Sequence, residues 1–281
     1  MAGVSTKAIK TRIRSMESTR QITKAMELVA ASKLRTVQQK AVQVQPYFDE
    51  LYTAMTRIAS SSRSFESPFL TVRGTGKQAW VVIAGDRGLA GGYNNNILKL
   101  CASQMSPETC AVLPIGKKAV EYFTRHGYEI ITDRYAEVSD VSIGDSFTVM
   151  LLLSDYYLSG KYSSIHLGYT GFVSLLTQTP LTLSLLPLPE IRHEGEPKRE
   201  IIYESGSASV FNAIVPEYLG GLLYGAVCES VASEQAARRA AMDSATKNAD
   251  EIIDILNLSY NRARQGAITQ EITEIVAGAE N

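Results

Sequence analysis

The stretch of the chain with the strongest indication of chemistry is AGDRGLAGGYN, from Ala84 to Asn94. It follows an apolar run, precedes a helix-prone segment, and holds four glycines within eight residues. A strand, a glycine-rich turn and a helix N-terminus cradle phosphate in many nucleotide-binding proteins. However, the glycines match neither GxxxxGK[ST] nor GxGxxG, and Asp86 would repel a phosphate unless Arg87 offsets its charge. A tight turn that needs positive φ, followed by a capped helix, is the favoured interpretation, and a nucleotide site is the alternative.

Other residue types that carry chemistry are sparse or badly spaced. The chain has three histidines, and none has a partner at the spacing of metal ligands. No serine or cysteine stands in a nucleophile motif. Asp250 and Glu251 are adjacent carboxylates on a helix-prone segment, where solvation is the ordinary outcome. The sequence therefore predicts no catalytic residues, no metal site and no cofactor.

Length and composition limit the class of protein. The chain has 281 residues, 45% of them hydrophobic, and a net charge of −1, which predicts one or two domains and no general attraction to nucleic acid. Its three cysteines lack CxxC spacing, as expected of free thiols in a reducing compartment. Its longest apolar runs fall short of the ~20 residues of a membrane span, and no signal-peptide pattern is visible. We expect a soluble chain that can still dock on a membrane complex.

Any functional site has to be positioned by the elements of the fold, and the longest of these are two predicted helices, here called rods, at the two ends of the chain. Residues 4–58 contain no glycine and one proline, Pro46, which should bend a helix without ending it. Residues 209–277 are again helix-prone. In both rods apolar residues recur in alternating steps of three and four, as in the seam of a left-handed coiled coil. The seam positions are Ile9, Ile13, Met16, Arg20, Thr23, Glu27, Ala30, Leu34, Val37, Ala41, Val44, Phe48, Leu51, Met55 and Ile58 in the first rod, and Met242, Ala245, Ala249, Ile252, Leu256, Ser259, Ala263 and Gly266 in the second.

The unequal rods predict an overhang. If they form an antiparallel hairpin of equal rise, Val4 lies level with about residue 263, and the rest of the second rod has no partner within the chain. An exposed apolar stripe on such a segment marks an interaction site. An ordinary helical bundle is the alternative, although the chain offers no third long helix to cover the stripe. The stripe consists of Ile268, Ile272, Ile275 and Val276.

The first rod is also basic. Residues 1–45 carry nine lysines and arginines against two glutamates. Such a charge could face nucleic acid, an acidic protein surface or water. No aromatic residue interleaves the charges, which argues against nucleic acid.

The middle of the chain alternates between strand-like and helix-like segments. The strand-like segments are QAWVVIAG, CAVLPIG, YEIITD and KYSSIHLGYTGF, with LTLSLLPLP as a further extended piece. The helix-like segments are NNNILKLCASQM, KKAVEYFTRHG and SIGDSFTVMLLLSDYYLSG. This alternation predicts an α/β layer fold with a largely parallel sheet. The charged, irregular segment 190–207 is expected to lead into the second rod.

Three stretches resemble the γ subunit of F-type ATP synthases. They are RQITKAMELVAASK, GDRGLAGGYN, and SEQAARRAAMDSATKNA through YNRARQGAITQEITEIVAGA, and the resemblance spans essentially the whole chain. It implies a coiled coil of two terminal helices, residues 1–58 and 209–281, joined to a Rossmann-like α/β domain of residues 59–208. It also implies a non-catalytic rotor subunit that couples proton flow to ATP synthesis or hydrolysis by turning inside the α3β3 hexamer.

The same resemblance implies partners and a location. The partners are the α and β subunits, the ε subunit and the ring of c subunits, with no nucleic acid. The location is the cytoplasmic face of the cell membrane, which the chain reaches only through the complex. No insertion with paired cysteines is visible, so thiol regulation is not expected.

Several residues match contact positions of that family. Lys24 and Met26 match the shaft position that faces acidic loops of the β subunits, and the overhang matches the tip held in an apolar sleeve of the hexamer. A polar contact with β loops is matched by Arg264, Gln265 and Thr269.

Two departures from the family pattern lie elsewhere. Arg238 matches an arginine of the second helix, but Arg239 follows where the family usually has methionine. Ala90 stands at a position where the family frequently has cysteine. If the chain is a subunit of this family, Arg87 of the glycine loop would meet an acidic partner instead of a nucleotide. Two rival hypotheses are a nucleotide-binding α/β protein with a coiled-coil appendage and a coiled-coil scaffold.

Overall fold

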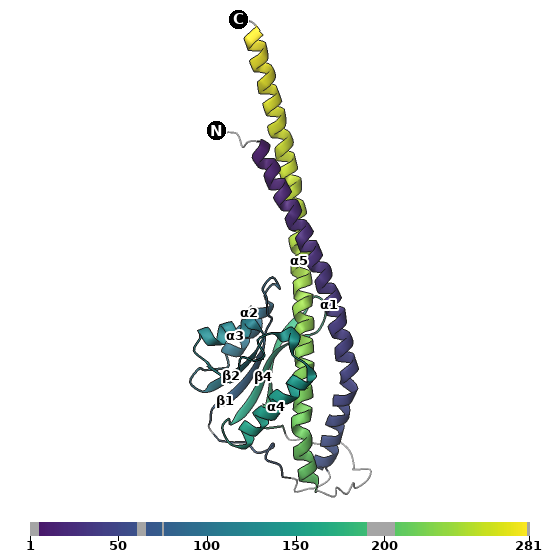
Figure 1. The fold of residues 1–281 in the computed structure, drawn as a ribbon, viewed down its shortest axis with the longest axis vertical. Helices are drawn as coiled ribbons and strands as arrows, with labels where there is room; N and C mark the ends of the chain where they lie inside the picture. Colours follow the sequence, from purple (N-terminus) through teal and green to yellow (C-terminus); the bar gives the residue numbers. More distant parts are fainter. Residues whose placement is uncertain (1–5, 61–65, 75, 190–205, 280–281) are drawn as a thin grey trace. The chain divides into compact units, whose positions relative to one another are not determined.

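The computed structural model describes residues 6–60, 66–74, 76–189 and 206–279 (Figure 1). Long helices stand at both ends of the chain, and short strands and helices alternate between them. The elements are α1 (Thr6–Ser60), β1 (Gln78–Ile83), α2 (Tyr93–Ala102), β2 (Cys110–Ile115), α3 (Lys117–Arg125), β3 (Glu129–Ile130), the 3₁₀ helix η1 (Val138–Asp140), α4 (Ile143–Leu158), β4 (Ser164–Phe172), β5 (Gln178–Leu186) and α5 (Ser207–Ala279). Contacts divide the chain into two compact units, residues 1–31 with 238–281 and residues 32–237.

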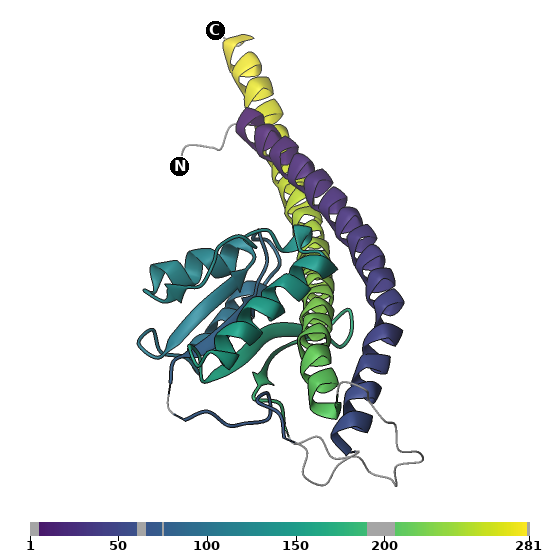
Figure 2. The same ribbon diagram turned by 60° about the horizontal axis from the view of Figure 1, so that its bottom comes forward.

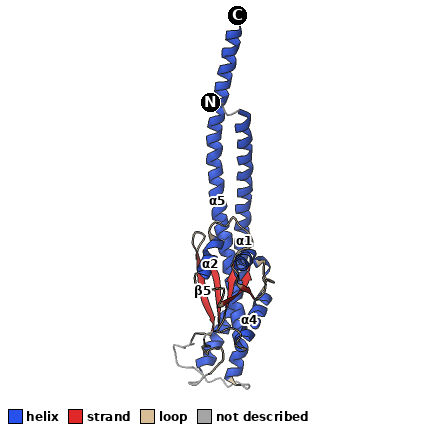
Figure 3. Cartoon of the chain, turned by 90° about the vertical axis from the view of Figure 1, so that its left-hand side faces the viewer, coloured by secondary structure: helices blue, strands red, loops and turns tan. Residues whose placement is uncertain are grey.

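The unit of residues 32–237 contains a five-stranded sheet in the order β3-β2-β1-β4-β5 (Figure 3). The strands β1 to β4 pair in parallel, and β5 runs antiparallel to β4. Helices connect the parallel strands, because a parallel pair needs a crossover. The predicted α/β class, the mostly parallel sheet and the order of its elements are confirmed.

Both faces of this sheet are covered by helices, which explains the almost continuous apolar runs of β1 and β2. On one face the sheet packs against α4 and the first part of α5, and on the other against α2 and α3 (Figure 2). The pleat of β1 sends successive side chains to opposite faces, so Val81 joins the first layer and Val82 the second.

Two glycines of α5 allow neighbouring helices to approach its backbone within this unit. A Cβ at Gly220 would lie 2.2 Å from the ring of Phe147 on α4, and one at Gly221 would lie 1.9 Å from the ring of Phe48 on α1. These glycines therefore serve packing, although glycine lowers helix propensity. As expected, α1 continues through Pro46.

The other unit is an antiparallel pair of helices made by the start of α1 and the end of α5. Arg20 lies 3.1 Å from Asp250, and the hydroxyl of Thr23 lies 2.7 Å from that of Thr246, so ascending positions on α1 meet descending positions on α5. The predicted coiled coil is confirmed. Three predicted seam positions of the second helix are wrong. Ile252 is 42% exposed and its neighbour Ile253 only 8%. Ser259 is exposed whereas Tyr260 beside it is partly buried, and Gly266 is exposed. Steps of three and four both fit 3.6 residues per turn, and here the seam takes a step of four.

The last turns of α5 are not covered by any described residue of this unit. Continuing the same register places Thr6 opposite about residue 264, close to the predicted level. Every described side chain from Arg264 to Val276 is exposed. Figure 1 shows this end of α5 extending past the start of α1. The predicted apolar overhang is therefore present, with Ile268, Ile272, Ile275 and Val276 between 44% and 71% exposed.

Among the described residues one helix, α5, is long and apolar enough to cross a membrane by length and composition alone. Half of its apolar window is buried inside the structure, and core helices of soluble proteins pass the same test. Residues 190–205 of the predicted charged segment 190–207, including His193, lie outside the described residues.

Candidate functional site

The glycine loop between β1 and α2 is a turn held by its own side chains. Asn94 accepts a hydrogen bond from the Gly85 N–H at 2.8 Å and donates one to the Arg87 carbonyl at 3.1 Å. Gly91 has a φ of +57°, as the tight-turn interpretation requires, and Leu89 also has a positive φ of 63°. The expected cap is wrong, because no side chain caps the N-terminus of α2.

Asp86 connects this loop to the next crossover. Its carboxylate accepts hydrogen bonds from the backbone N–H groups of Val138 at 2.9 Å and Lys117 at 3.3 Å. Lys117 is the first residue of α3, so the carboxylate lies at the positive end of that helix. The sequence suggested Asp86 only as a repulsive charge, and the structure gives it a structural role.

The backbone of the loop also lies against the turn before α3. Gly116 has a φ of +95°, and a Cβ there would lie 2.0 Å from the Ala84 carbonyl oxygen. The Lys118 N–H donates to the Gly85 carbonyl at 3.0 Å. Only glycine allows this approach, so Gly116 is required by the same loop although the sequence did not single it out.

Side chains of α5 reach the carboxyl ends of β1 and β4. The strand order changes direction between these two strands, which is where open α/β folds bind ligands. Glu234 of α5 is 5% exposed, and a Cβ at Gly85 would lie 2.9 Å from its Oε1. A carboxylate of the chain itself therefore occupies the side of the glycine loop where a phosphate would be expected. Sequence analysis missed Glu234, although an acidic residue in a stripe of small residues is a usable signal.

Exposed charges surround the loop on its outer side. Lys117 forms a 2.5 Å ion pair with Glu137, and the pKa of Glu137 is lowered by this hydrogen bond and, to a smaller extent, by the charge of Arg87. Arg87 itself is exposed. The loop thus presents a charged surface on its outer side, and the Glu234 carboxylate lies against its inner side.

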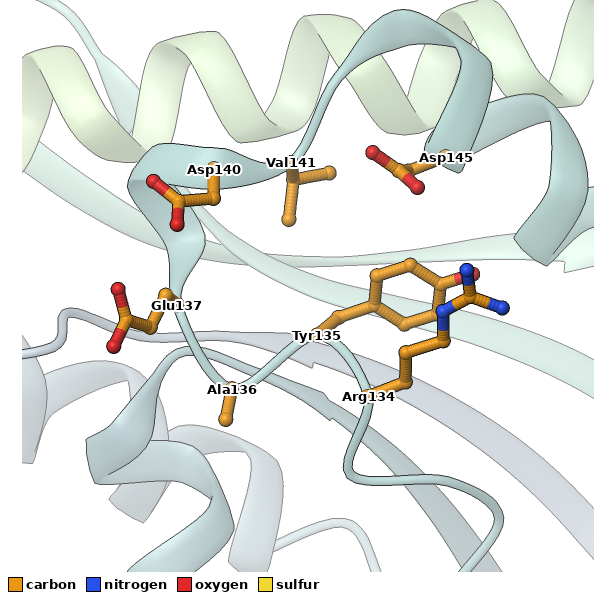
Figure 4. Close-up of a pocket in the computed structure, with 7 residues that line it drawn as sticks. All are labelled: Arg134, Tyr135, Ala136, Glu137, Asp140, Val141 and Asp145. Atoms are coloured by element: carbon orange, nitrogen blue, oxygen red, sulfur yellow. The ribbon is translucent and has the colours of Figure 1, made fainter.

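A hollow of about 270 Å³ opens between β3 and α4 (Figure 4). Asp145 lies in it near Arg134, while Asp140 and Glu137 lie toward its other end. The pKa of Asp145 is lowered by hydrogen bonds from Ser142, with which it forms a capping box. These carboxylates are engaged in local contacts, and no group of three or more metal-ligating side chains was found among the described residues. The hollow is lined by Arg134, Tyr135, Ala136, Glu137, Asp140, Val141 and Asp145.

Comparison with known proteins gives the family. A family model described as ATP synthase matches residues 5–281. The ATP synthase gamma chain of Ruminococcus albus is 43% identical over 281 residues, covering 98% of each chain. The chain belongs to the ATP synthase gamma-chain family. The sodium-ion-specific ATP synthase gamma chain of Acetobacterium woodii is 38% identical over 293 residues, covering 97% of each chain.

A solved structure shows the same fold. It is a chain of the Euglena gracilis mitochondrial ATP synthase OSCP/F1/c-ring assembly in rotational state 3, with a TM-score of 0.66, 17% identity, and coverage of 98% of this chain and 93% of that one. As a member of the gamma-chain family, this chain is a central-stalk subunit of ATP synthase, a membrane-associated complex, and is not an enzyme by itself. The predicted family and its non-catalytic role are confirmed.

The family's expected contact positions are distributed over both units. Lys24 forms an ion pair with Glu27 at 2.9 Å, and Met26 beside it is partly exposed. Arg264, Gln265 and Thr269 are exposed, and the Thr269 hydroxyl bonds only the Gln265 carbonyl, at 2.9 Å.

The two remaining contact positions differ in exposure. Arg238 is half-buried, whereas Arg87 is exposed on the glycine loop. The assignment of all these positions as subunit contacts stays a prediction.

Proposed function

We propose that this gamma chain is the rotating shaft of its complex. The exposed apolar end of α5 carries the proposal, because a stripe of this kind is unstable in water and needs a surrounding partner. A hexamer of three α and three β subunits would enclose it. Rotation of the shaft would couple proton flow through the membrane sector to ATP synthesis or hydrolysis at the β subunits.

The proposed contacts follow charge and exposure. The basic surface of α1, with Lys24 and Met26, would face acidic loops of the β subunits. The exposed polar turn of Arg264, Gln265 and Thr269 would bond to β loops below the apolar end. Here the shaft acts as a ligand with different affinity for each β conformation, which is how rotation can change three sites in sequence.

The partly exposed Arg238 would add a further contact from α5. The exposed Arg87 would meet an acidic surface of another subunit.

The α/β domain would contact the ε subunit and the c-subunit ring. In this arrangement the chain lies at the cytoplasmic face of the membrane and reaches it only through the complex. We propose that the chain is divided into two coiled-coil helices, residues 1–58 and 209–281, and an α/β domain, residues 59–208. The alternative of a nucleotide-binding protein is not favoured, because the Glu234 carboxylate of α5 lies against the glycine loop.

Reconstitution tests this function. The full chain is mixed with α-like and β-like subunits, and we expect co-elution as one chain with three of each and ATP hydrolysis only in the mixture. A double variant, Ile272→Asp with Ile275→Asp, should lower the yield of complex, because charges replace the apolar stripe. The matched control is Gln270→Asp with Thr273→Asp, which adds the same charges at positions that are already polar. ATP turnover by the chain alone, or equal loss in both variants, would refute the proposal.

A further inference from the structure

The end of β4 projects beyond the strand beside it. β1 pairs with β4 only from Ser164 to Gly168, whereas β4 continues to Phe172 in its pairing with β5. Residues 169–172 therefore have no strand on the β1 side. Buried backbone N–H and C=O groups need partners, so another part of the chain has to supply them.

Side chains of α5 take the place of the missing strand. The Thr170 N–H donates to the Ser230 hydroxyl at 3.2 Å, and the Thr170 carbonyl accepts from the Ser233 hydroxyl at 3.1 Å. Both serines are fully buried. Their spacing of three puts both hydroxyls on one helix face. At the last residue of β4, the Phe172 N–H donates to the carboxylate of Glu229 on α5.

The next residue of α5 reaches the neighbouring loop. The buried Glu234 carboxylate contacts Gly85, as described above. Burial raises the pKa of the nearby Tyr93 on α2, and the charge of Glu234 raises it further. One helical turn of α5 therefore touches β4, the glycine loop and α2, all inside the unit of residues 32–237.

The earlier part of α5 touches the sheet differently. Phe211, Val215, Leu219 and Leu223 are fully buried in the apolar layer on the sheet. Apolar burial is non-directional, so it limits the rotation of the helix only through the shape of the packed side chains. Hydrogen bonds require alignment of donor and acceptor, so they limit that rotation more sharply.

We propose that Ser230, Ser233 and Glu234, here named the polar joint, lock α5 against twisting on the α/β domain and so transmit torque between them. The inference rests on the proposed function as a rotating shaft. The three residues are positioning residues, since their described contacts are with β4, α2 and the glycine loop of the same chain.

Amide exchange in the full chain tests the contact itself. In a Ser230→Ala, Ser233→Ala double variant the Thr170 amide loses its acceptor, and we expect it to exchange roughly tenfold to a hundredfold faster. The matched control is Ser154→Ala on α4, which removes a buried hydroxyl that has no hydrogen-bond partner. If the double variant does not fold, Ser230→Ala alone removes the acceptor of the Thr170 amide and replaces the double variant in both assays.

Coupling in the assembled complex tests the role in torque. We expect the double variant to pump fewer ions per ATP hydrolysed in vesicles than the Ser154→Ala control. Hydrolysis by the soluble α3β3 complex with the same chain should be unchanged, because no load crosses the polar joint there. Unchanged pumping, or an equal loss in the soluble complex, would overturn the inference. A wild-type chain that supports no coupled activity would instead contradict the proposed function.

Discussion

Replacing Gly116 by alanine should damage the α/β domain far more than replacing Gly127. Both glycines have positive φ, +95° and +74°. A Cβ at Gly116 would lie 2.0 Å from the Ala84 carbonyl oxygen, whereas one at Gly127 meets nothing within 4 Å. The two variants therefore share a backbone penalty of about 1–2 kcal/mol, and only Gly116→Ala adds a clash.

The clash can be relieved only by moving backbone. Separating the two turns weakens the hydrogen bond from the Ala84 N–H to the Ile115 carbonyl, 2.9 Å, and that from the Gly116 N–H to the Tyr135 carbonyl, 3.0 Å. Each lost bond costs about 1 kcal/mol or more when its partners stay buried. Gly116→Ala should therefore cost about 3–4 kcal/mol or more in unfolding free energy, against about 1–2 kcal/mol for Gly127→Ala.

Urea unfolding followed by tryptophan fluorescence measures this difference. The chain has one tryptophan, Trp80, which is buried in β1 and so reports on this domain. A difference of ~2 kcal/mol or more between Gly116→Ala and Gly127→Ala is expected in the extrapolated free energies. Costs equal to within about 0.5 kcal/mol would refute the reasoning, because they would mean that the close approach at Gly116 is not required.

Three further outcomes are expected. Burial lowers the pKa of His166 below its ordinary value of 6.5, and its ring stacks on Trp80 at 4.6 Å. The fold thus favours neutral His166, so the unfolding free energy should fall as the pH drops below about 6.5, and His166→Gln should remove that slope in pH-dependent urea titrations. Asp86→Ala leaves two backbone N–H groups without their acceptor and should cost about 1–3 kcal/mol in thermal unfolding, whereas Asp140→Ala in the same region should cost less than about 0.5 kcal/mol. Met26→Lys would place a cation toward the acidic loops proposed above and should lower ATP synthesis per ion moved in vesicles, and Met26→Leu should not; equal yields would contradict that contact.

The elements that sequence analysis predicted correctly depend on local periodicity. The seam of α1 follows from its repeat, and Ile9, Ala30 and Leu34 are buried where that repeat places them. The strands follow from short apolar runs between turn residues. The overhang needed only helix lengths, since rise per residue is constant.

The parts that sequence analysis missed depend on contacts between distant residues. Glu234 stands out locally as an acidic residue in a stripe of small residues, but nothing local indicates that it meets Gly85 or that Ser230 bonds β4. The error at Ile252 has a different cause. Helix geometry allows a step of three or of four residues along the seam, and contact with the partner helix decides between them. Sequence analysis predicted correctly that the glycine loop is a turn, but it did not predict that the Glu234 carboxylate lies beside that loop.

Hydrogen bonds between residues far apart in the chain also set an order of events during synthesis. Thr170 is separated from Ser230 by 60 residues, which take about 3–12 s to translate, so the end of β4 waits that long for its partner. Thr23 is separated from Thr246 by 223 residues, a wait of about 11–45 s. During that time the emerging α1 has no partner helix, and its excess of lysine and arginine helps to keep it in solution. The basic charge that we propose to face a partner subunit would thus first protect an unfinished protein.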